Sequence, residues 1–287
     1  MNFFFDALKR EAGEAMEAQI EPLKPATEAS TVGAAQSAAP ATVRPAKRVA
    51  HTAGTPERLV ATLKPPVLDG SVVAMEQCRL LRNRVRETMR SQKARSIMLT
   101  SPMAGEGKTL LSINLAHTLS QLENTHVLLI DADLRRPGVE ATLGLNDPKG
   151  LTEYLRGEIG FDEALQQLSP KLDVMAATST EKSSEFVHSP LMEKVIAQAS
   201  ARYDFVVVDA PPLFPIVDAQ VLAGIVDAVL LVVRAEQTPY DMAMQCEQIE
   251  SLRGKIIGTV LNCATKLPHN QYGKYGYGSR GYLPVSR

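Results

Sequence analysis

The sequence predicts a doubly wound α/β domain built on a mostly parallel β-sheet. Short runs that are apolar almost without alternation recur along the chain, which is typical of strands covered on both faces. Stretches with helical periodicity lie between these runs, and this alternation favours right-handed crossovers between parallel strands. The 287 residues suffice for one large domain, or for one domain with tails.

The elements of this domain can be followed from residue 71 onward. A helix is predicted from residue 72, because Cys78, Leu81, Val85 and Met89 recur at spacings of three and four. The predicted strands are residues 96–100, 126–131, 172–176, 205–209, 228–233 and 256–262. The predicted helices between them include residues 109–123 and 189–203. In this fold class, chemistry is expected at the carboxyl ends of the strands.

The regions outside the predicted domain (71–267) differ from it in amino-acid composition. Residues 16–70 are rich in Ala, Pro, Thr, Ser and Glu and poor in large apolar residues, so we expect a disordered linker. Residues 1–15 could form a short helix that docks on a partner or membrane surface, or could be only a frayed tail. Residues 268–287 are rich in Tyr and Gly and predict a flexible tail.

The composition argues against several classes of protein. The formal net charge of −1 shows no basic balance, so no nucleic-acid partner is expected. Cys78, Cys246 and Cys263 are far apart, which argues against a disulfide framework or a structural zinc site and fits a reducing compartment. No apolar run approaches the roughly 18 residues of a bilayer span, and the N-terminus lacks a positive leader. We therefore expect a cytoplasmic protein.

The stretch LTSPMAGEGKTLL (99–111) has the layout of a phosphate-binding loop. A strand ends, a glycine-bearing loop follows, and a helix opens at Gly107-Lys108-Thr109. Loop N–H groups and the helix N-terminus can face an anion, the lysine can reach the β/γ-phosphates, and the threonine hydroxyl can meet magnesium. Pro102 replaces the first glycine of GxxxxGK[ST], and an ordinary loop with a surface lysine is the alternative. The predicted ATP-binding residues of this loop are Ala104, Gly105, Glu106, Gly107, Lys108, Thr109 and Leu110.

Polar side chains end three further predicted strands. Asp131 and Asp133 lie in VLLIDADLRRP, and Asp209 lies in FVVVDAPP. Paired carboxylates beside a phosphate site can hold magnesium and accept a proton, and the two arginines after Asp133 could offset phosphate charge. The alternative for the pair is a strand cap with a solvated turn. Asn262 ends another strand, where its amide could pair with a base edge of ATP or could make a turn.

In this order and spacing, SPMAGEGKT, VLLIDADLRRP and FVVVDAPP resemble the Walker A, Walker A′ and Walker B motifs of bacterial tyrosine kinases of capsule and exopolysaccharide loci. The resemblance covers roughly residues 70–287, and the second motif is its most specific part. It implies a P-loop NTPase fold like that of partition and positioning ATPases, and a protein-tyrosine kinase that uses Mg-ATP. The implied catalytic residues are Lys108, Asp131, which would activate the tyrosine hydroxyl, and Asp133. The implied magnesium ligands are Thr109, Asp133 and Asp209.

The resemblance also implies self-association and self-phosphorylation. The ExxRxxR helix of the family is matched by Glu76, Arg79 and Arg82, which would join subunits in a ring; a solvated charged face is the alternative. In the family, a C-terminal tyrosine cluster is phosphorylated from subunit to subunit. The matching tyrosines are Tyr272, Tyr275, Tyr277 and Tyr282. No acidic residue follows Glu250, so the cationic tail should be drawn to an acidic site. A sticky tail without chemistry is the alternative.

The implied partners are a membrane polysaccharide co-polymerase, a tyrosine phosphatase and further copies of the chain. They would place the protein at the inner face of the cell membrane, as the type encoded apart from its membrane domain. A partition-type ATPase switch is one alternative function, although Met103 stands where those proteins usually carry a lysine. A non-catalytic nucleotide-binding regulator of polysaccharide assembly is the other, although Lys108, Thr109 and the three aspartates are intact.

Overall fold

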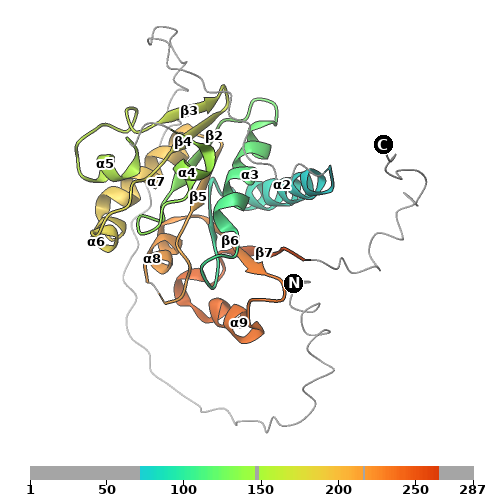
Figure 1. The fold of residues 1–287 in the computed structure, drawn as a ribbon. Coiled ribbons are helices and arrows are strands. Elements are labelled where there is room, and N and C mark those ends of the chain that lie inside the picture. Colours follow the sequence, from blue (N-terminus) through green and yellow to red (C-terminus); the bar gives the residue numbers. More distant parts are fainter. Residues whose placement is uncertain (1–71, 146–148, 216, 265–287) are drawn as a thin grey trace, which may run out of the picture.

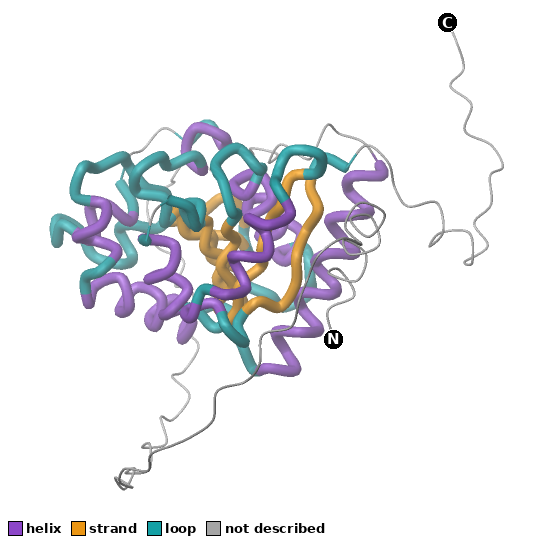
Figure 2. The backbone as a smooth tube through the Cα atoms, turned by 90° about the horizontal axis from the view of Figure 1, so that it is seen from below, coloured by secondary structure: helices purple, strands orange, loops and turns teal. Residues whose placement is uncertain are grey.

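The computed structural model describes residues 72–145, 149–215 and 217–264. Within these residues a seven-stranded sheet lies between helices on its two faces (Figures 1 and 2). No helix of this part of the chain combines the length and apolarity that a bilayer span requires. The predicted docking helix (1–15), linker (16–70) and tyrosine tail (268–287) lie outside the described residues and stay predictions.

The strands follow the spatial order β3-β4-β2-β5-β1-β6-β7. They are β1 (Ser96–Thr100), β2 (Val127–Asp131), β3 (Gln166–Ser169), β4 (Leu172–Met175), β5 (Phe205–Asp209), β6 (Ala228–Arg234) and β7 (Ile256–Asn262). All neighbouring pairs are parallel except β3 with β4. The sheet is therefore mostly parallel, as predicted, and the six predicted strands are all present.

The helices occupy the connections between strands and cover the two faces of the sheet (Figure 1). They are α2 (Val72–Gln92), α3 (Lys108–Ser120), α4 (Val139–Leu143), α5 (Leu151–Leu155), α6 (Ser183–Val187), α7 (Pro190–Arg202), α8 (Asp218–Ile225) and α9 (Tyr240–Gln248), with a 3₁₀ turn at Glu250–Leu252. The three predicted helices correspond to α2, α3 and α7. The short elements β3, α4, α5, α6, α8 and α9 add to them, because their few residues carry little periodic signal.

Two hydrophobic layers hold the helices to the sheet. One contains Met98 of β1 together with residues of α5, α7 and α8. The other contains Ile97 and Leu99 of the same strand together with residues of α2, α3 and α4. Successive strand residues point to opposite faces, and both faces are covered, so the middle residues of β1, β2 and β5 are apolar and all residues of these strands are buried.

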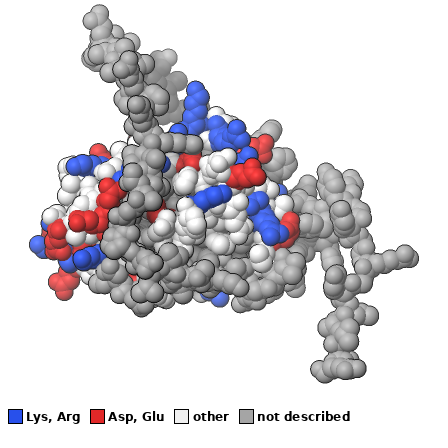
Figure 3. All heavy atoms as spheres, turned by 90° about the horizontal axis from the view of Figure 1, so that it is seen from above, with Lys and Arg blue, Asp and Glu red and all other residues white. Residues whose placement is uncertain are grey.

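The strand order places a topological switch point at the centre of the sheet. β5 lies between β1 and β2, and β1 pairs with β6 on its other side. Ligands of open α/β sheets bind at such a point, outside the carboxyl ends of the strands. Lys and Arg gather in one part of the face shown in Figure 3 and mix with Asp and Glu elsewhere, in keeping with the nearly neutral composition.

Candidate active site

The P-loop connects the carboxyl end of β1 to the start of α3, as the sequence predicts. Gly107 is the N-cap of α3 with φ of 90°, a left-handed conformation that favours glycine, and no side chain caps the helix by a hydrogen bond among the described residues. A Cβ added at Gly107 would collide with the side-chain amide of Asn262, so a larger residue there would displace that amide as well as strain the backbone. The amino terminus of α3 thus presents backbone N–H groups at the switch point, which suits a phosphate.

Glu106 links the P-loop to the segment that follows β6. The residue is only 2% exposed. One of its carboxylate oxygens accepts a hydrogen bond from Met103 N at 2.9 Å, and the other accepts one from the hydroxyl of Thr238. Arg234, at the end of β6, donates to Gly105 O at 3.0 Å. We call Glu106, Thr238, Arg234 and Asn262 the loop clamp. Charge-assisted contacts of this kind are stronger than neutral ones, so the clamp fixes the loop conformation.

Asn262 is the last residue of β7, and its side chain contacts the P-loop. Its Nδ2 donates to Glu106 O at 2.8 Å, and its Oδ1 accepts from Cys263 N at 2.9 Å. The side chain therefore supports the loop that would carry the nucleotide phosphates. One Nδ2 proton and one Oδ1 lone pair remain, so the predicted contact with the base of ATP stays a prediction.

Asp209 lies at the end of β5, directly opposite Asp131 in the register of β2 and β5. Ser112 donates to Asp209 Oδ1 at 3.0 Å, and the Thr109 hydroxyl lies close enough to this carboxylate to lower its pKa. The second oxygen, Asp209 Oδ2, is buried without a hydrogen-bond partner among the described residues. Burial raises the pKa of Asp209 to about 6, while Lys108 and the two hydroxyls oppose that rise.

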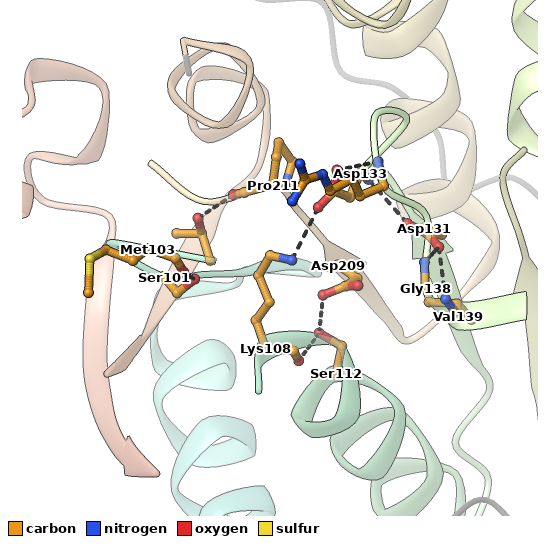
Figure 4. A network of polar contacts seen from close by, with 12 residues as sticks. Ser101, Met103, Lys108, Ser112, Asp131, Asp133, Gly138, Val139, Asp209 and Pro211 are labelled. Atoms are coloured by element: carbon orange, nitrogen blue, oxygen red, sulfur yellow. Dashed lines mark hydrogen bonds and ion pairs between the residues drawn. The ribbon is translucent and has the colours of Figure 1, made fainter. Parts of the chain in front are cut away.

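Asp131 is completely buried and is held by backbone donors (Figure 4). Its Oδ2 accepts from Gly138 N at 2.9 Å and Val139 N at 3.0 Å, and its Oδ1 accepts from Asp133 N at 3.1 Å. These three hydrogen bonds hold the end of β2 next to the start of α4. Burial raises the pKa of Asp131 to about 8, the nearby Asp209 adds to this, and the three N–H donors oppose it.

Asp133 faces the P-loop lysine (Figure 4). Lys108 Nζ lies 3.1 Å from Asp133 Oδ2, and both side chains are nearly buried. The other oxygen of Asp133 accepts from Arg136 N at 3.1 Å. The structure thus brings Lys108, Thr109 and the three predicted aspartates together at one end of the sheet.

The two arginines after Asp133 have different surroundings. Arg135 donates to Asp218 at 2.8 Å and to Ser184 at 2.6 Å, so its guanidinium links the loop to α6 and α8. Arg136 is exposed, and its guanidinium makes no described ion pair. Of the two, Arg136 is therefore the better placed to offset phosphate charge.

The donor set fits the magnesium and nucleotide that the sequence predicts. Hard carboxylate and hydroxyl oxygens are the ligands that Mg²⁺ prefers, and the unpartnered Asp209 Oδ2 is one such oxygen beside Thr109. Magnesium in phosphoryl-transfer sites takes one or two carboxylates plus phosphate oxygens rather than an all-protein cage. The residues present can therefore hold Mg-ATP.

Sequence reasoning missed three polar residues of the site and one glycine that donates through its backbone. Ser112 stands four residues after Lys108 on α3, and this helical spacing is a signal that could have found it. Arg234 and Thr238 reach the P-loop from 129 and 132 residues away, and nothing local in the sequence signals these contacts. Gly138 contacts Asp131 only because the segment after β2 turns back.

The predicted subunit-contact face lies on the N-terminal half of α2. Arg79 pairs with Glu76 at 3.3 Å, and the two side chains are 48% and 60% exposed. Arg82 bonds Asn83 and reaches Thr118 O of α3 at 3.4 Å. The exposed Leu80 adds apolar surface between them. The four tail tyrosines lie outside the described residues.

Comparison with known proteins identifies the family. A family described as an AAA domain matches residues 94–256. "Tyrosine-protein kinase YwqD" of Bacillus subtilis (strain 168) is 33% identical over 204 residues, which cover 70% of this chain and 86% of that protein. "Succinoglycan biosynthesis transport protein ExoP" of Rhizobium meliloti (strain 1021) is 32% identical over 195 residues, 66% of this chain but only 24% of that protein.

A solved structure supports the same assignment. The kinase domain of the Escherichia coli tyrosine kinase ETK superposes with a TM-score of 0.63 at 27% sequence identity, covering 75% of this chain and 83% of that chain. The mostly parallel sheet of this chain and its three motifs agree with the P-loop NTPase fold predicted from the sequence. The chain therefore belongs to the bacterial tyrosine kinases.

Proposed function

We propose that the site at the carboxyl ends of the strands transfers the γ-phosphoryl group of ATP to tyrosine side chains of the chain's own C-terminal cluster. The family to which the chain belongs consists of protein-tyrosine kinases. Relatives that are named as kinases favour this activity over the alternative of a partition-type ATPase. The observation that carries the proposal is the convergence of Lys108, Asp131, Asp133 and Asp209 on one P-loop.

Each residue has a proposed role in the transfer. The P-loop N–H groups and Lys108 bind and orient the phosphates, and the clamp keeps the loop in shape. The tyrosine oxygen forms a bond to the γ-phosphorus, the bond to the bridging oxygen breaks, ADP leaves, and the tyrosine proton passes to a carboxylate. Magnesium supplies charge neutralisation when bound, and Thr109, Asp133 and Asp209 would hold it.

Asp131 is the proposed proton acceptor, and its surroundings define what that role requires. A base works best when its pKa lies near the working pH, and the pKa of about 8 meets this condition. The carboxylate has no exposed surface, so the acceptor hydroxyl must enter between the P-loop and the segment after β2. Asp133, which is 4% exposed and also faces Lys108, is the alternative acceptor.

The proposed acceptor residues are Tyr272, Tyr275, Tyr277 and Tyr282 of a neighbouring copy. They follow the last described residues at the end of β7, and four cations but no carboxylate occur in residues 265–287. A tail of this charge is attracted by three carboxylates and ATP phosphates. Phosphates on all four tyrosines would add about −6 to −8 charge, which opposes renewed docking and favours release of the subunit.

The proposed setting is polysaccharide synthesis or export at the inner face of the cell membrane. Relatives include a succinoglycan biosynthesis transport protein and a putative tyrosine-protein kinase in a cps region. We expect a membrane polysaccharide co-polymerase to recruit the chain, a tyrosine phosphatase to reset it, and a ring of copies to form through Glu76, Arg79 and Arg82.

The direct test is incubation of the purified full chain with Mg-ATP, followed by a phosphotyrosine blot. Protein should come from a strain without another tyrosine kinase. Lys108→Met should lower the signal by about 10²–10³-fold, since it removes one preorganised electrostatic contact to the transferring group. Lys194→Met changes an exposed lysine of α7 and should leave the signal intact. Equal signals from wild type and Lys108→Met would contradict the proposal.

A further inference from the structure

A cavity lies at the opposite end of the sheet from the P-loop. It has a volume of about 860 Å³ and is formed where the C-terminal end of α2 meets the amino end of β5 and the connection from α3 to β2. A smaller cavity of about 340 Å³ shares Arg86 and Arg90 with it and continues it along α2. The larger volume lies in the range of small-molecule and cofactor sites.

The rim of this cavity is cationic and largely unpaired. Arg86, Arg90 and Lys93 line it, and their side chains make no described hydrogen bond or ion pair. Arg95 also lines it and donates to Tyr203 O at 3.1 Å. Among the described lining residues, two acids, Glu123 and Asp204, share the larger cavity with these four cations, and Glu87 lines the smaller one. The carboxyl end of a helix attracts cations, which accounts for Arg90 in the last turn of α2. The helix end does not account for the excess of positive charge along the rest of the rim.

The floor of the cavity is apolar. Met89, Ala94, Leu122 and Phe205 contribute to its lining. Arginine guanidinium groups bind phosphate in bidentate fashion and also stack on aromatic rings. A cationic rim over an apolar floor therefore suits a ligand that joins an aromatic ring to a dianion, and phosphotyrosine has this chemistry.

We propose that this cavity binds phosphotyrosine of the C-terminal cluster, from the same copy or a neighbour. The inference rests on the proposed function, which makes phosphotyrosine on this chain. The unmodified tail carries only cations and is repelled by the rim, whereas about −6 to −8 of added charge reverses the sign. The product tail would then be held away from the carboxylates that made it.

The chain is long enough for this exchange. Tyr275 and Tyr277 lie 11 and 13 residues beyond Ala264, so they reach at most about 36–47 Å from it when the chain is extended. The sheet is shorter along its strands, because seven-residue strands such as β7 measure about 23 Å. A tail that starts at the carboxyl end of β7 is therefore long enough to reach the amino ends of β1 and β5 in its own copy.

The test measures binding of a labelled synthetic peptide of residues 268–287 to the dephosphorylated full chain, by fluorescence anisotropy without ATP. The peptide phosphorylated at Tyr275 and Tyr277 should bind at least about tenfold more tightly than the unmodified peptide. Arg86→Gln/Arg90→Gln/Lys93→Gln should remove at least about nine-tenths of that affinity. Arg84→Gln/Lys194→Gln/Arg253→Gln removes three exposed cations elsewhere and should retain it.

Three outcomes would overturn the inference. Equal binding of both peptides would exclude recognition of phosphate, and full binding by the rim variant would place recognition elsewhere. Tighter binding to vesicles of anionic phospholipid than to the phosphopeptide, lost in the rim variant, would assign the cavity to a membrane surface instead. Because the peptide is synthetic, the result does not depend on kinase activity, and a failed blot with successful peptide binding would separate the two proposals.

Discussion

Buried acidic side chains gather at the carboxyl ends of the strands and basic side chains at the amino ends, and the two groups differ in how they are held. At the carboxyl ends, Asp131, Asp133 and Asp209 are buried, and almost every oxygen meets an N–H, a hydroxyl or Lys108. At the amino ends, Arg86 is half-buried, Arg90 and Lys93 are exposed, and none has a carboxylate partner among the described residues. The first arrangement is preorganised, as chemistry requires, and the second is open, as capture of a mobile ligand requires.

The largest expected effect comes from the carboxylates at the catalytic end. Single Asn substitutions at Asp131, Asp133 and Asp209 should each remove most of the phosphotransfer rate. The losses should not add in the double variants, because proton transfer and phosphate alignment occur in one step. Single-turnover assays with Mg-ATP measure this, and the rim variant of the amino end should keep its single-turnover rate. Near-normal turnover of Asp131→Asn would move the base role to Asp133.

The loop clamp should have the next largest effect. Thr238→Val removes the hydroxyl that holds Glu106, and Glu106→Gln removes the charge that strengthens the hydrogen bonds from Met103 N–H and Thr238. Hydrogen bonds to charged groups contribute about 1.5–3 kcal/mol, so ATP affinity should fall by about tenfold or more. Titration with a fluorescent ATP analogue measures it, with Thr88→Val on α2 as the matched control. The double variant should bind no worse than the weaker single one, and additive losses would mean that the two side chains act separately.

The pH dependence of stability should distinguish the buried acids from exposed ones. The pKa values of about 8 for Asp131 and about 6 for Asp209 exceed the value of about 3.9 in an unfolded chain. The folded state therefore binds extra protons, and its stability should fall as the pH rises through 6 and then 8. Thermal unfolding without nucleotide should show this fall between pH 5 and 9. Asp209→Asn should reduce this dependence of stability on pH, whereas Asp241→Asn, at an exposed position, should leave it unchanged. A wild-type stability that does not change with pH would contradict the burial of Asp131 and Asp209.

The smallest effect on the single chain should come from the N-terminal half of α2. Changing Glu76, Arg79 and Arg82 together to Ala removes an exposed i,i+3 pair that contributes only a few tenths of a kcal/mol to folding. ATP binding should persist while the oligomer dissociates, as light scattering would show. Glu193→Ala/Lys194→Ala on α7 is the matched control. Unchanged oligomers in the triple variant would make this face an ordinary solvated surface, unlike the cationic half of the same helix.

The central strands and the site acids were predictable because each has a local signal. Uninterrupted apolar runs marked β1, β5 and β6, and Asp131 and Asp209 stood at the ends of such runs. Strand β3 was not predicted, because Gln166–Ser169 is polar and pairs only at the edge of the sheet.

The clamp and the cationic cavity could not be predicted, for a different reason. Glu106 meets Thr238 across 132 residues, and the cavity joins α2 to Asp204 and Phe205. Contacts of this kind depend on which strands become neighbours, and no local periodicity encodes strand order. The motif residues could be located by pattern alone, whereas their supports required the folded sheet.

The most direct test of the account is to map phosphate after incubation of the wild-type chain with Mg-ATP, by mass spectrometry of its peptides. Phosphate should occur on several of Tyr272, Tyr275, Tyr277 and Tyr282, and replacing all four by Phe should remove most of it. Little phosphate should occur on Tyr154 or Tyr203, because both side chains are buried. The Tyr203 hydroxyl also donates a hydrogen bond to Asp173 at 2.7 Å, and burial raises the pKa of that hydroxyl. Phosphate found mainly on Tyr154, Tyr203 or Tyr240 would contradict the account.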